Sequence, residues 1–158
     1  MSNTVSRGGV PASLANYSVG KWSGDTLFLA GVVAADPATG RVIRGYEDVA
    51  PEVARQLGAT GQMSVDSKEG PIAAQAWFIL DQVRRTLEGE GLTLRHVVKL
   101  TQYMKDLRDF PIYNRVRLTF FPEDPPASTV IQVVGLLPTD ESRLEVDVVA
   151  TRHLAPQQ

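Results

Sequence analysis

The 158-residue chain contains no cysteine and only two histidines, His96 and His153. The lack of cysteine excludes disulfide bonds, thiolate catalysis and cysteine-ligated zinc. The two histidines lie far apart in the sequence and neither belongs to a metal-ligand motif, so we expect no metal and no cofactor. Neither histidine has an identifiable nucleophile partner, and a Ser-His-Asp triad is therefore not indicated.

The chain also lacks a charge excess and a long apolar segment. Its formal net charge is −2, from 16 basic and 18 acidic residues, so nothing in the composition predicts binding to nucleic acid or to an anionic membrane. No apolar run is long enough to cross a bilayer, and the first residues have no apolar core of a signal peptide. We therefore expect a cytoplasmic protein.

Hydrophobic residues make up 43% of the chain, which is ordinary for a globular protein, and we expect one domain over residues 1–158. Apolar periodicity predicts a helix over 71–88 and a second over 109–121. Pro71 suits a first helical turn. Gly89 or Gly91 suits the stop at the C-terminal end of the first helix.

β-Branched and apolar residues predict strands over 96–104, 128–137 and 143–151. Residues 25–45 are typical of a strand, a turn and a second short strand. The order is strands, long helix, strand, helix, strand, strand. This order predicts an α+β fold in which two helices pack on one face of a mixed sheet.

Residues 46–70 fit this scheme less well. We interpret them as an extended loop or insert that holds a short helix over 49–57. A loop of this length in a compact domain is often functional or part of an interface, although a role in packing alone fits the sequence equally.

The last predicted strand, "RLEVDVVAT" at 143–151, carries an unusual polar face. Apolar residues alternate with Arg143, Glu145 and Asp147, which is the pattern of a strand with one buried face. The polar face has two interpretations. It points to water, as exposed carboxylates commonly do, or it lines a pocket in which Glu145 transfers protons. On the strand pattern alone, the interpretation that this face points to water is favoured.

Five sequence blocks resemble, in the same order, the Rid (YjgF) family of enamine/imine deaminases, and together they extend over residues 14–152. The blocks are "NYS", "LFLAGVVAADPATGRV", "LEGEGLTLRHVVKLTQYMKDLRDFPIYNRV", "FFPEDPPASTV" and "LEVDVVAT". No single block is decisive, but five in the right order are specific.

The resemblance implies a chorismate-mutase-like fold and a homotrimer, a trimeric barrel with pockets between subunits. In this family a strand glutamate acts around a water that attacks a carbon–nitrogen double bond, and Glu145 matches that glutamate. Tyr17, Gly31 and Asn114 match other pocket positions, whereas we interpret the matching Asp147 as structural. With the resemblance, the pocket interpretation of Glu145 is favoured, and burial at an interface would raise the pKa of Glu145.

The chain departs from the family where the deaminases bind the substrate carboxylate. Their "PARS" arginine is replaced within "PPAST" by Ser128, or by Ala127 if the gap is placed elsewhere, so a bidentate guanidinium is missing. Ala30 replaces the usual serine. Arg117 stands where an aromatic residue is common, and is either a surface charge or a substitute for the missing arginine. Ser128 and Thr129 are candidate hydroxyl ligands of a polar substrate.

Two functions fit these residues. The first is a small-molecule enamine or imine hydrolase that acts in a pocket between subunits on a substrate other than 2-aminoacrylate. The alternative, which the missing arginine favours, is a catalytically inactive trimeric protein that binds a metabolite or regulates a partner. A ribonuclease, an activity sometimes attributed to the family, is disfavoured by the net charge and by the lack of a basic, aromatic groove.

Overall fold

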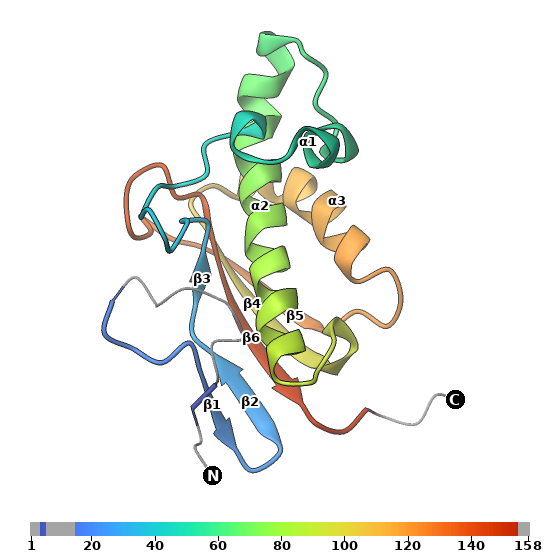
Figure 1. The fold of residues 1–158 in the computed structure, drawn as a ribbon. Coiled ribbons are helices and arrows are strands. Elements are labelled where there is room, and N and C mark those ends of the chain that lie inside the picture. Colours follow the sequence, from blue (N-terminus) through green and yellow to red (C-terminus); the bar gives the residue numbers. More distant parts are fainter. Residues whose placement is uncertain (1–3, 6–14, 155–158) are drawn as a thin grey trace.

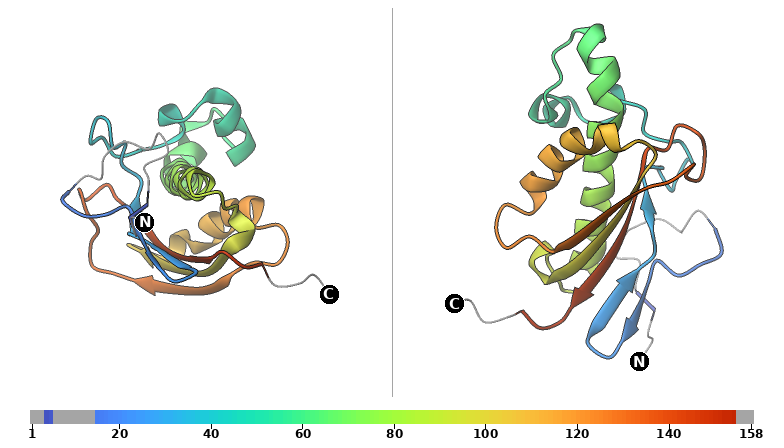
Figure 2. Two further views of the ribbon diagram at one scale, coloured as in Figure 1. Left: turned by 60° about the horizontal axis from the view of Figure 1, so that its bottom comes forward. Right: turned by 180° about the vertical axis from the view of Figure 1, so that it is seen from behind.

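The structure is a computed structural model that describes residues 4–5 and 15–154. It has two layers, a twisted sheet and a pair of helices (Figure 1). The helices α2 (Met63–Gly89) and α3 (Phe110–Phe120) cover the same face of the sheet, as the view along the layers shows (Figure 2, left). We call the other face of the sheet the open face.

The sheet is mixed. Its strands are β1 (Gly20–Ser23), β2 (Thr26–Leu29), β3 (Val32–Val33), β4 (Val97–Met104), β5 (Ala127–Gln132) and β6 (Leu144–Thr151). The order is β1-β2-β6-β4-β5, and β3 pairs with β6 beyond the end of β2. Only the pairing of β4 with β5 is parallel; the other pairings are antiparallel. The predicted α+β fold, with two helices on one face of a mixed sheet, is confirmed.

The core lies between α2 and the central strands. Every second residue of β6 is buried, and the side chains between them are half-buried on the open face, as the alternation of 143–151 predicts. The apolar stripe of α2 covers the buried face of the sheet. Its fully buried members include Ile72, Ile79 and Val83, and burial of each such side chain contributes roughly 1.5–3 kcal/mol to folding.

The interpretation of 46–70 as an extended loop is wrong for most of its length. The segment forms a 3₁₀ turn, η1 (Tyr46–Asp48), the helix α1 (Pro51–Leu57) and the first eight residues of α2, so only the predicted short helix is retained. The start of α2 is fixed by Asp66, whose carboxylate accepts hydrogen bonds from the backbone N–H of Thr60 and Gly61 at 2.9 and 2.8 Å.

Pro71 therefore lies inside α2 and not in its first turn. The lack of its N–H removes one helical hydrogen bond. The ring of Tyr46 packs on the neighbouring Gly70, where a Cβ would approach Cδ2 of Tyr46 to 3.1 Å. At the other end of α2, Gly91 has a φ of +74°. This left-handed conformation stops the helix and is accessible to glycine at little cost.

The strands differ from the prediction in three ways. β5 ends at Gln132 and not at residue 137. The predicted strand, turn and strand of 25–45 become β2, β3 and an isolated bridge between Ala35 and Val42. β1 extends the sheet beyond β2 and was not predicted. No helix within residues 4–5 and 15–154 has the length and hydropathy needed to cross a membrane.

Candidate functional site

A hollow of about 440 Å³ lies beside β3 and the start of β6. We call it the glutamate pocket, and its lining residues are Ala15, Tyr17, Ala30, Gly31, Val33, Leu137, Pro138 and Glu145. It brings together four residues that the sequence proposed for one site: Tyr17, Ala30, Gly31 and Glu145. Apart from Glu145 and the Tyr17 hydroxyl, the side chains of the pocket are apolar.

Strand register places the Glu145 side chain in this pocket. Glu145 pairs with Val33 on one side and with Tyr103 on the other, and its neighbours in β6 are buried under the helices. Glu145 therefore points to the open face. Gly31, between β2 and β3, passes directly beneath the carboxylate: a Cβ built on Gly31 would overlap Oε1 of Glu145. The Glu145 carboxylate can occupy this position only because Gly31 has no Cβ; a larger residue would displace it.

The surroundings of Glu145 favour its protonated form. Burial is the main cause that raises the pKa of Glu145, and the charge of Asp147 raises it further. No group among residues 4–5 and 15–154 donates a hydrogen bond to the Glu145 carboxylate that would oppose the shift. A raised pKa makes the ionised Glu145 carboxylate a stronger proton acceptor, which suits general acid–base chemistry.

Asp147, which the sequence interpretation treated as structural, is held by a tyrosine. The hydroxyl of Tyr103 donates a hydrogen bond to Oδ2 of Asp147 at 3.1 Å, and this bond is the main cause that raises the pKa of Tyr103. The position of the Asp147 charge, which acts on Glu145, is therefore fixed by a neighbouring strand.

The remaining candidates, except Thr129, meet at a second place, between α3 and the outer strand β5. Nη1 of Arg117 donates to Oγ of Ser128 at 2.8 Å and to Oε1 of Gln102 at 3.3 Å. Nη2 of Arg117 donates to Oδ1 of Asn114 at 2.7 Å. Oε1 of Gln102 also accepts a hydrogen bond from the hydroxyl of Tyr113 at 2.7 Å. We call these five residues the arginine cluster.

The arginine cluster and the glutamate pocket lie on opposite faces of the sheet. Ser128 pairs with Leu100, which is fully buried under the helices, so Ser128 points to the helix side, where Arg117 meets it. The next residue, Thr129, points to the open face and accepts a hydrogen bond from Nζ of Lys99. Within one chain, the structure thus separates the predicted residues into two groups.

Residues 43–152 match the family model described as Endoribonuclease L-PSP, the YjgF/RutC/Rid family. The chain belongs to this family. The match covers more than half of the chain, and the predicted resemblance to the Rid family is confirmed.

Relatives of the family match almost the whole chain. A 2-iminobutanoate/2-iminopropanoate deaminase of Salmonella typhimurium is 30% identical over 156 residues, which cover 97% of this chain and 100% of the relative. A RutC family protein of Pyrococcus horikoshii is 28% identical over 153 residues, with coverage of 97% and 100%. A solved structure of a Klebsiella pneumoniae protein, described as a candidate endoribonuclease, is 42% identical with a TM-score of 0.84, and covers 85% of this chain and 98% of its own.

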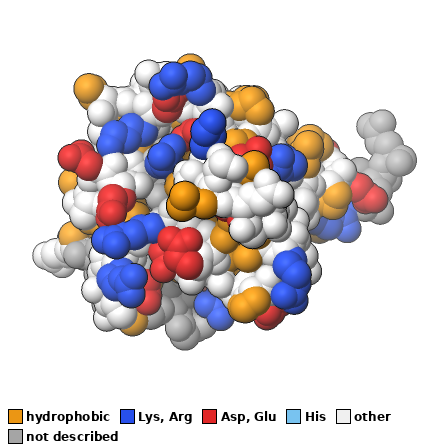
Figure 3. Space-filling view, turned by 90° about the horizontal axis from the view of Figure 1, so that it is seen from above, with side chains coloured by type: hydrophobic (Ala, Val, Ile, Leu, Met, Phe, Trp, Pro, Cys, Tyr) orange, Lys and Arg blue, Asp and Glu red, His pale blue; other side chains and the backbone are white. Residues whose placement is uncertain are grey.

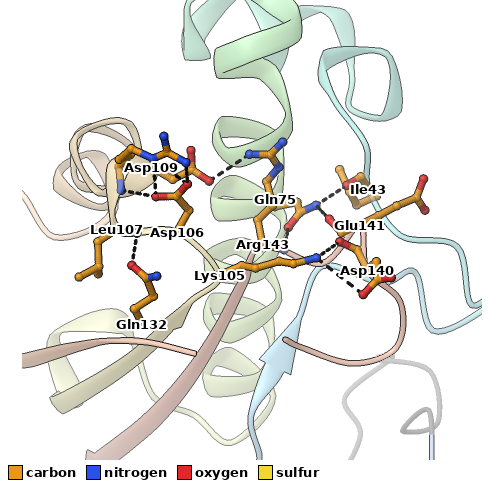
Figure 4. Close-up of polar contacts among 11 residues, drawn as sticks. Ile43, Gln75, Lys105, Asp106, Leu107, Asp109, Gln132, Asp140, Glu141 and Arg143 are labelled. Atoms are coloured by element: carbon orange, nitrogen blue, oxygen red, sulfur yellow. Dashed lines mark hydrogen bonds and ion pairs between the residues drawn. The ribbon is translucent and has the colours of Figure 1, made fainter. Parts of the chain in front are cut away.

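This member of the Rid family has another hollow, of about 580 Å³, near the end of β4 and the turn before β6. Its charged side chains neutralise one another (Figure 4). Arg143 pairs with Asp109 at 3.1 Å, and Lys105 approaches Asp140 at 3.8 Å. From above, basic and acidic side chains are interspersed (Figure 3). Because these charged side chains are already paired with one another, we interpret them as a network that stabilises the fold and not as a binding site.

Several residues of the site region, among them Gln102 and Tyr103, were missed by the sequence interpretation. Gln102 lies between Leu100 and Met104 in the buried alternation of β4. An amide in such a series signals a buried hydrogen-bond network, so the signal was present. Tyr103 carries no comparable signal, because its role depends on the pairing of β4 with β6. The pocket walls Leu137 and Pro138 come from a loop that has no periodic pattern.

Proposed function

We propose that the protein hydrolyses the carbon–nitrogen double bond of a small imine, or of an enamine after tautomerisation, in the glutamate pocket. One observation carries the proposal: the half-buried Glu145 carboxylate lies over Gly31 inside a hollow, and its pKa is raised by burial and by Asp147. The deaminase of Salmonella typhimurium, a relative over the whole of its length, supports the same reaction class.

In the proposed reaction, Glu145 takes a proton from a water molecule as the water oxygen bonds to the imine carbon. The π pair of the C=N bond moves to nitrogen, which receives the proton back from Glu145 to give a carbinolamine. A second proton transfer, from the carbinolamine hydroxyl to nitrogen, breaks the C–N bond and releases ammonia or an amine. The carbonyl product remains. General acid–base catalysis of this kind contributes roughly 10²–10⁴-fold to the rate.

We further propose that the complete site forms between copies of the chain in a homotrimer, a barrel of the chorismate-mutase type. The two groups of candidate residues lie on opposite faces of one sheet, so one small molecule cannot contact both in a single chain. A second copy packed against the open face could bring Thr129, which points to that face from β5, to the glutamate pocket. The exposure of Phe28 (49%) and Ile131 (42%) supports an interface there.

The proposed reaction is tested with imines that are generated enzymatically in the assay mixture. An amino acid oxidase generates 2-imino acids from a panel of amino acids with apolar side chains, and the release of keto acid is followed with and without the protein. We expect the wild type to accelerate the release and Glu145→Gln to lose the acceleration. A rate equal to that of the uncatalysed reaction over the whole panel would contradict the proposal.

One observation favours the alternative, a binding protein without turnover: β5, with the sequence ASTVIQ, carries no arginine. In that case the keto acid products would bind to the wild type, whereas no imine or enamine would be hydrolysed. The same panel therefore separates the two functions.

A further inference from the structure

Two carboxyl groups of β6 converge over one glycine. A Cβ built on Gly31 would overlap Oε1 of Glu145 and would lie 3.0 Å from Oδ1 of Asp147, so both carboxyl groups approach the same point of the backbone. Among residues 4–5 and 15–154, no lysine, arginine or histidine nitrogen lies within 4.0 Å of either carboxyl group. Two carboxylates in this arrangement repel each other, so another contact is needed to keep them together.

Tyr103 makes a contact that opposes this repulsion. It is the Cα partner of Glu145 in the pairing of β4 with β6, but its hydroxyl reaches along β6 and donates its hydrogen bond to Oδ2 of Asp147 at 3.1 Å. Because this bond is the main cause that raises the pKa of Tyr103, the hydroxyl keeps its proton and Asp147 is the acceptor. One oxygen of Asp147 is thus bound to β4 while the other lies near Gly31.

The other groups that face the carboxyl pair do not balance its charge. β3 and the loop at 137–138 contribute apolar side chains to the glutamate pocket, and Tyr17 is the lining residue besides Glu145 that can titrate. On β4, the Cα partner of Asp147 is the uncharged Thr101, and the ammonium of Lys99 donates to a threonine of β5. The charge that acts on Glu145 is therefore that of Asp147, in agreement with the causes of its raised pKa.

We propose that Tyr103 is a positioning residue of the reaction at Glu145: its hydroxyl holds the Asp147 carboxylate close to Glu145 against their mutual repulsion. The inference rests on the proposed function for the reaction, whereas the carboxyl pair and its hydrogen bond belong to the fold. Asp147 does not line the glutamate pocket, so it acts on a substrate through Glu145. When Glu145 accepts the proton of the attacking water, one of the two charges is neutralised and the repulsion ends. The pair thereby makes Glu145 a stronger base.

The test follows the protonation of Glu145 directly and needs no substrate. The protein is labelled with ¹³C at the glutamate carboxyl carbons and titrated with pH by NMR, and the Glu145 resonance is assigned as the one that is absent from Glu145→Gln. Tyr103→Phe removes the hydroxyl and keeps the ring. The matched control is Tyr46→Phe, which removes a tyrosine hydroxyl that donates to the carbonyl of Leu57 at 3.4 Å, outside the glutamate pocket.

We expect Asp147→Asn to lower the midpoint of the Glu145 titration by roughly one pH unit, Tyr103→Phe to lower it by roughly half as much, and Tyr46→Phe to leave it unchanged. Without the hydroxyl, the Asp147 carboxylate turns toward water and its charge acts on Glu145 from a longer distance. In the Asp147→Asn background, Tyr103→Phe should have no further effect, because the charge that the hydroxyl positions is gone. An unchanged or raised midpoint in Tyr103→Phe or in Asp147→Asn would overturn the inference. An equal change with and without Asp147 would also overturn it, because Tyr103 would then act by packing alone.

Activity measurements separate this inference from the proposed function. On an imine that the wild type hydrolyses, the acidic limb of the pH–rate profile of Tyr103→Phe should move to lower pH by as much as the NMR midpoint does. If Glu145→Gln stays fully active while Tyr103→Phe still lowers the midpoint, the proposed reaction at Glu145 fails and the role of Tyr103 in holding the carboxyl pair stands. If hydrolysis depends on Glu145 but the midpoint is independent of Tyr103, the proposed function stands and this inference fails.

Discussion

Replacement of Glu145 by glutamine should change activity and stability in opposite directions. The amide fills the volume of the carboxyl group over Gly31 but cannot accept the proton of the attacking water. Loss of a general acid–base group costs roughly 10²–10⁴ in rate, and at about 1.36 kcal/mol for each tenfold change this is about 2.7–5.4 kcal/mol of transition-state stabilisation. The value of kcat/KM should fall by that factor on any imine that the wild type hydrolyses.

The effect on stability follows from the raised pKa of Glu145. At a pH below the ordinary glutamate pKa, the carboxyl group is protonated in both the folded and the unfolded chain and contributes nothing. As the pH rises through the ordinary value toward the raised folded value, the unfolded chain ionises first, so the wild type loses stability. Glu145→Gln has no such loss, and should melt at the same temperature as wild type near pH 4 but at a higher temperature near pH 8.

Asp147→Asn is the paired control, because it removes a charge two residues along the same face. Without the Asp147 charge, the pKa of Glu145 should fall, and the acidic limb of the pH–rate profile should move to lower pH. Its kcat/KM at the optimum should change far less than that of Glu145→Gln. Full activity of Glu145→Gln, or a lower melting temperature than wild type near pH 8, would refute our account of the pocket.

Four further predictions concern assembly, the contact at Gly31 and specificity. Light scattering at micromolar protein should give about three times the chain mass of 17.2 kDa, and a monomer mass would exclude the shared site. Gly31→Ala should displace the Glu145 carboxylate and lower kcat/KM nearly as far as Glu145→Gln, with an unchanged circular dichroism spectrum; wild-type activity would show that the contact is unimportant. The protein should hydrolyse 2-aminoacrylate and 2-iminopropanoate poorly beside the deaminase of Salmonella typhimurium, and equal kcat/KM values would contradict this. Ala127→Arg, on the open face, is the variant expected to improve hydrolysis of these two, because an arginine at Ser128 would lie against Arg117.

The parts of the fold that depend on local periodicity could be predicted from the sequence. The alternation of 143–151 and the stripe of 71–88 each follow from which side chains face the core. The start of α2 at Met63 could not be predicted in this way. It depends on the Asp66 carboxylate, which binds the backbone of the preceding loop, and on Tyr46, which packs on Gly70. Both are contacts between segments that periodicity does not describe.

For the candidate site too, only some of the arrangement could be predicted from the sequence. The sequence proposed Tyr17, Gly31 and Glu145 for one site, and the structure brings them to one hollow. It could not assign Ser128 and Thr129 to different faces, because that depends on the register of β5 with β4, which only the folded sheet defines. The neutral surroundings of Arg117 likewise come from α3, β4 and β5 together.

The separation of the two groups also bears on how specificity can change in this family. Glu145 on β6, to which our proposal gives the proton transfer, has no side-chain contact in one chain with the cluster around Arg117 on α3. A change at 127–129 can therefore alter ligand binding while the Glu145 carboxylate, Gly31 and the Tyr103–Asp147 pair keep their geometry. The lack of an arginine in β5 therefore does not by itself imply loss of catalysis.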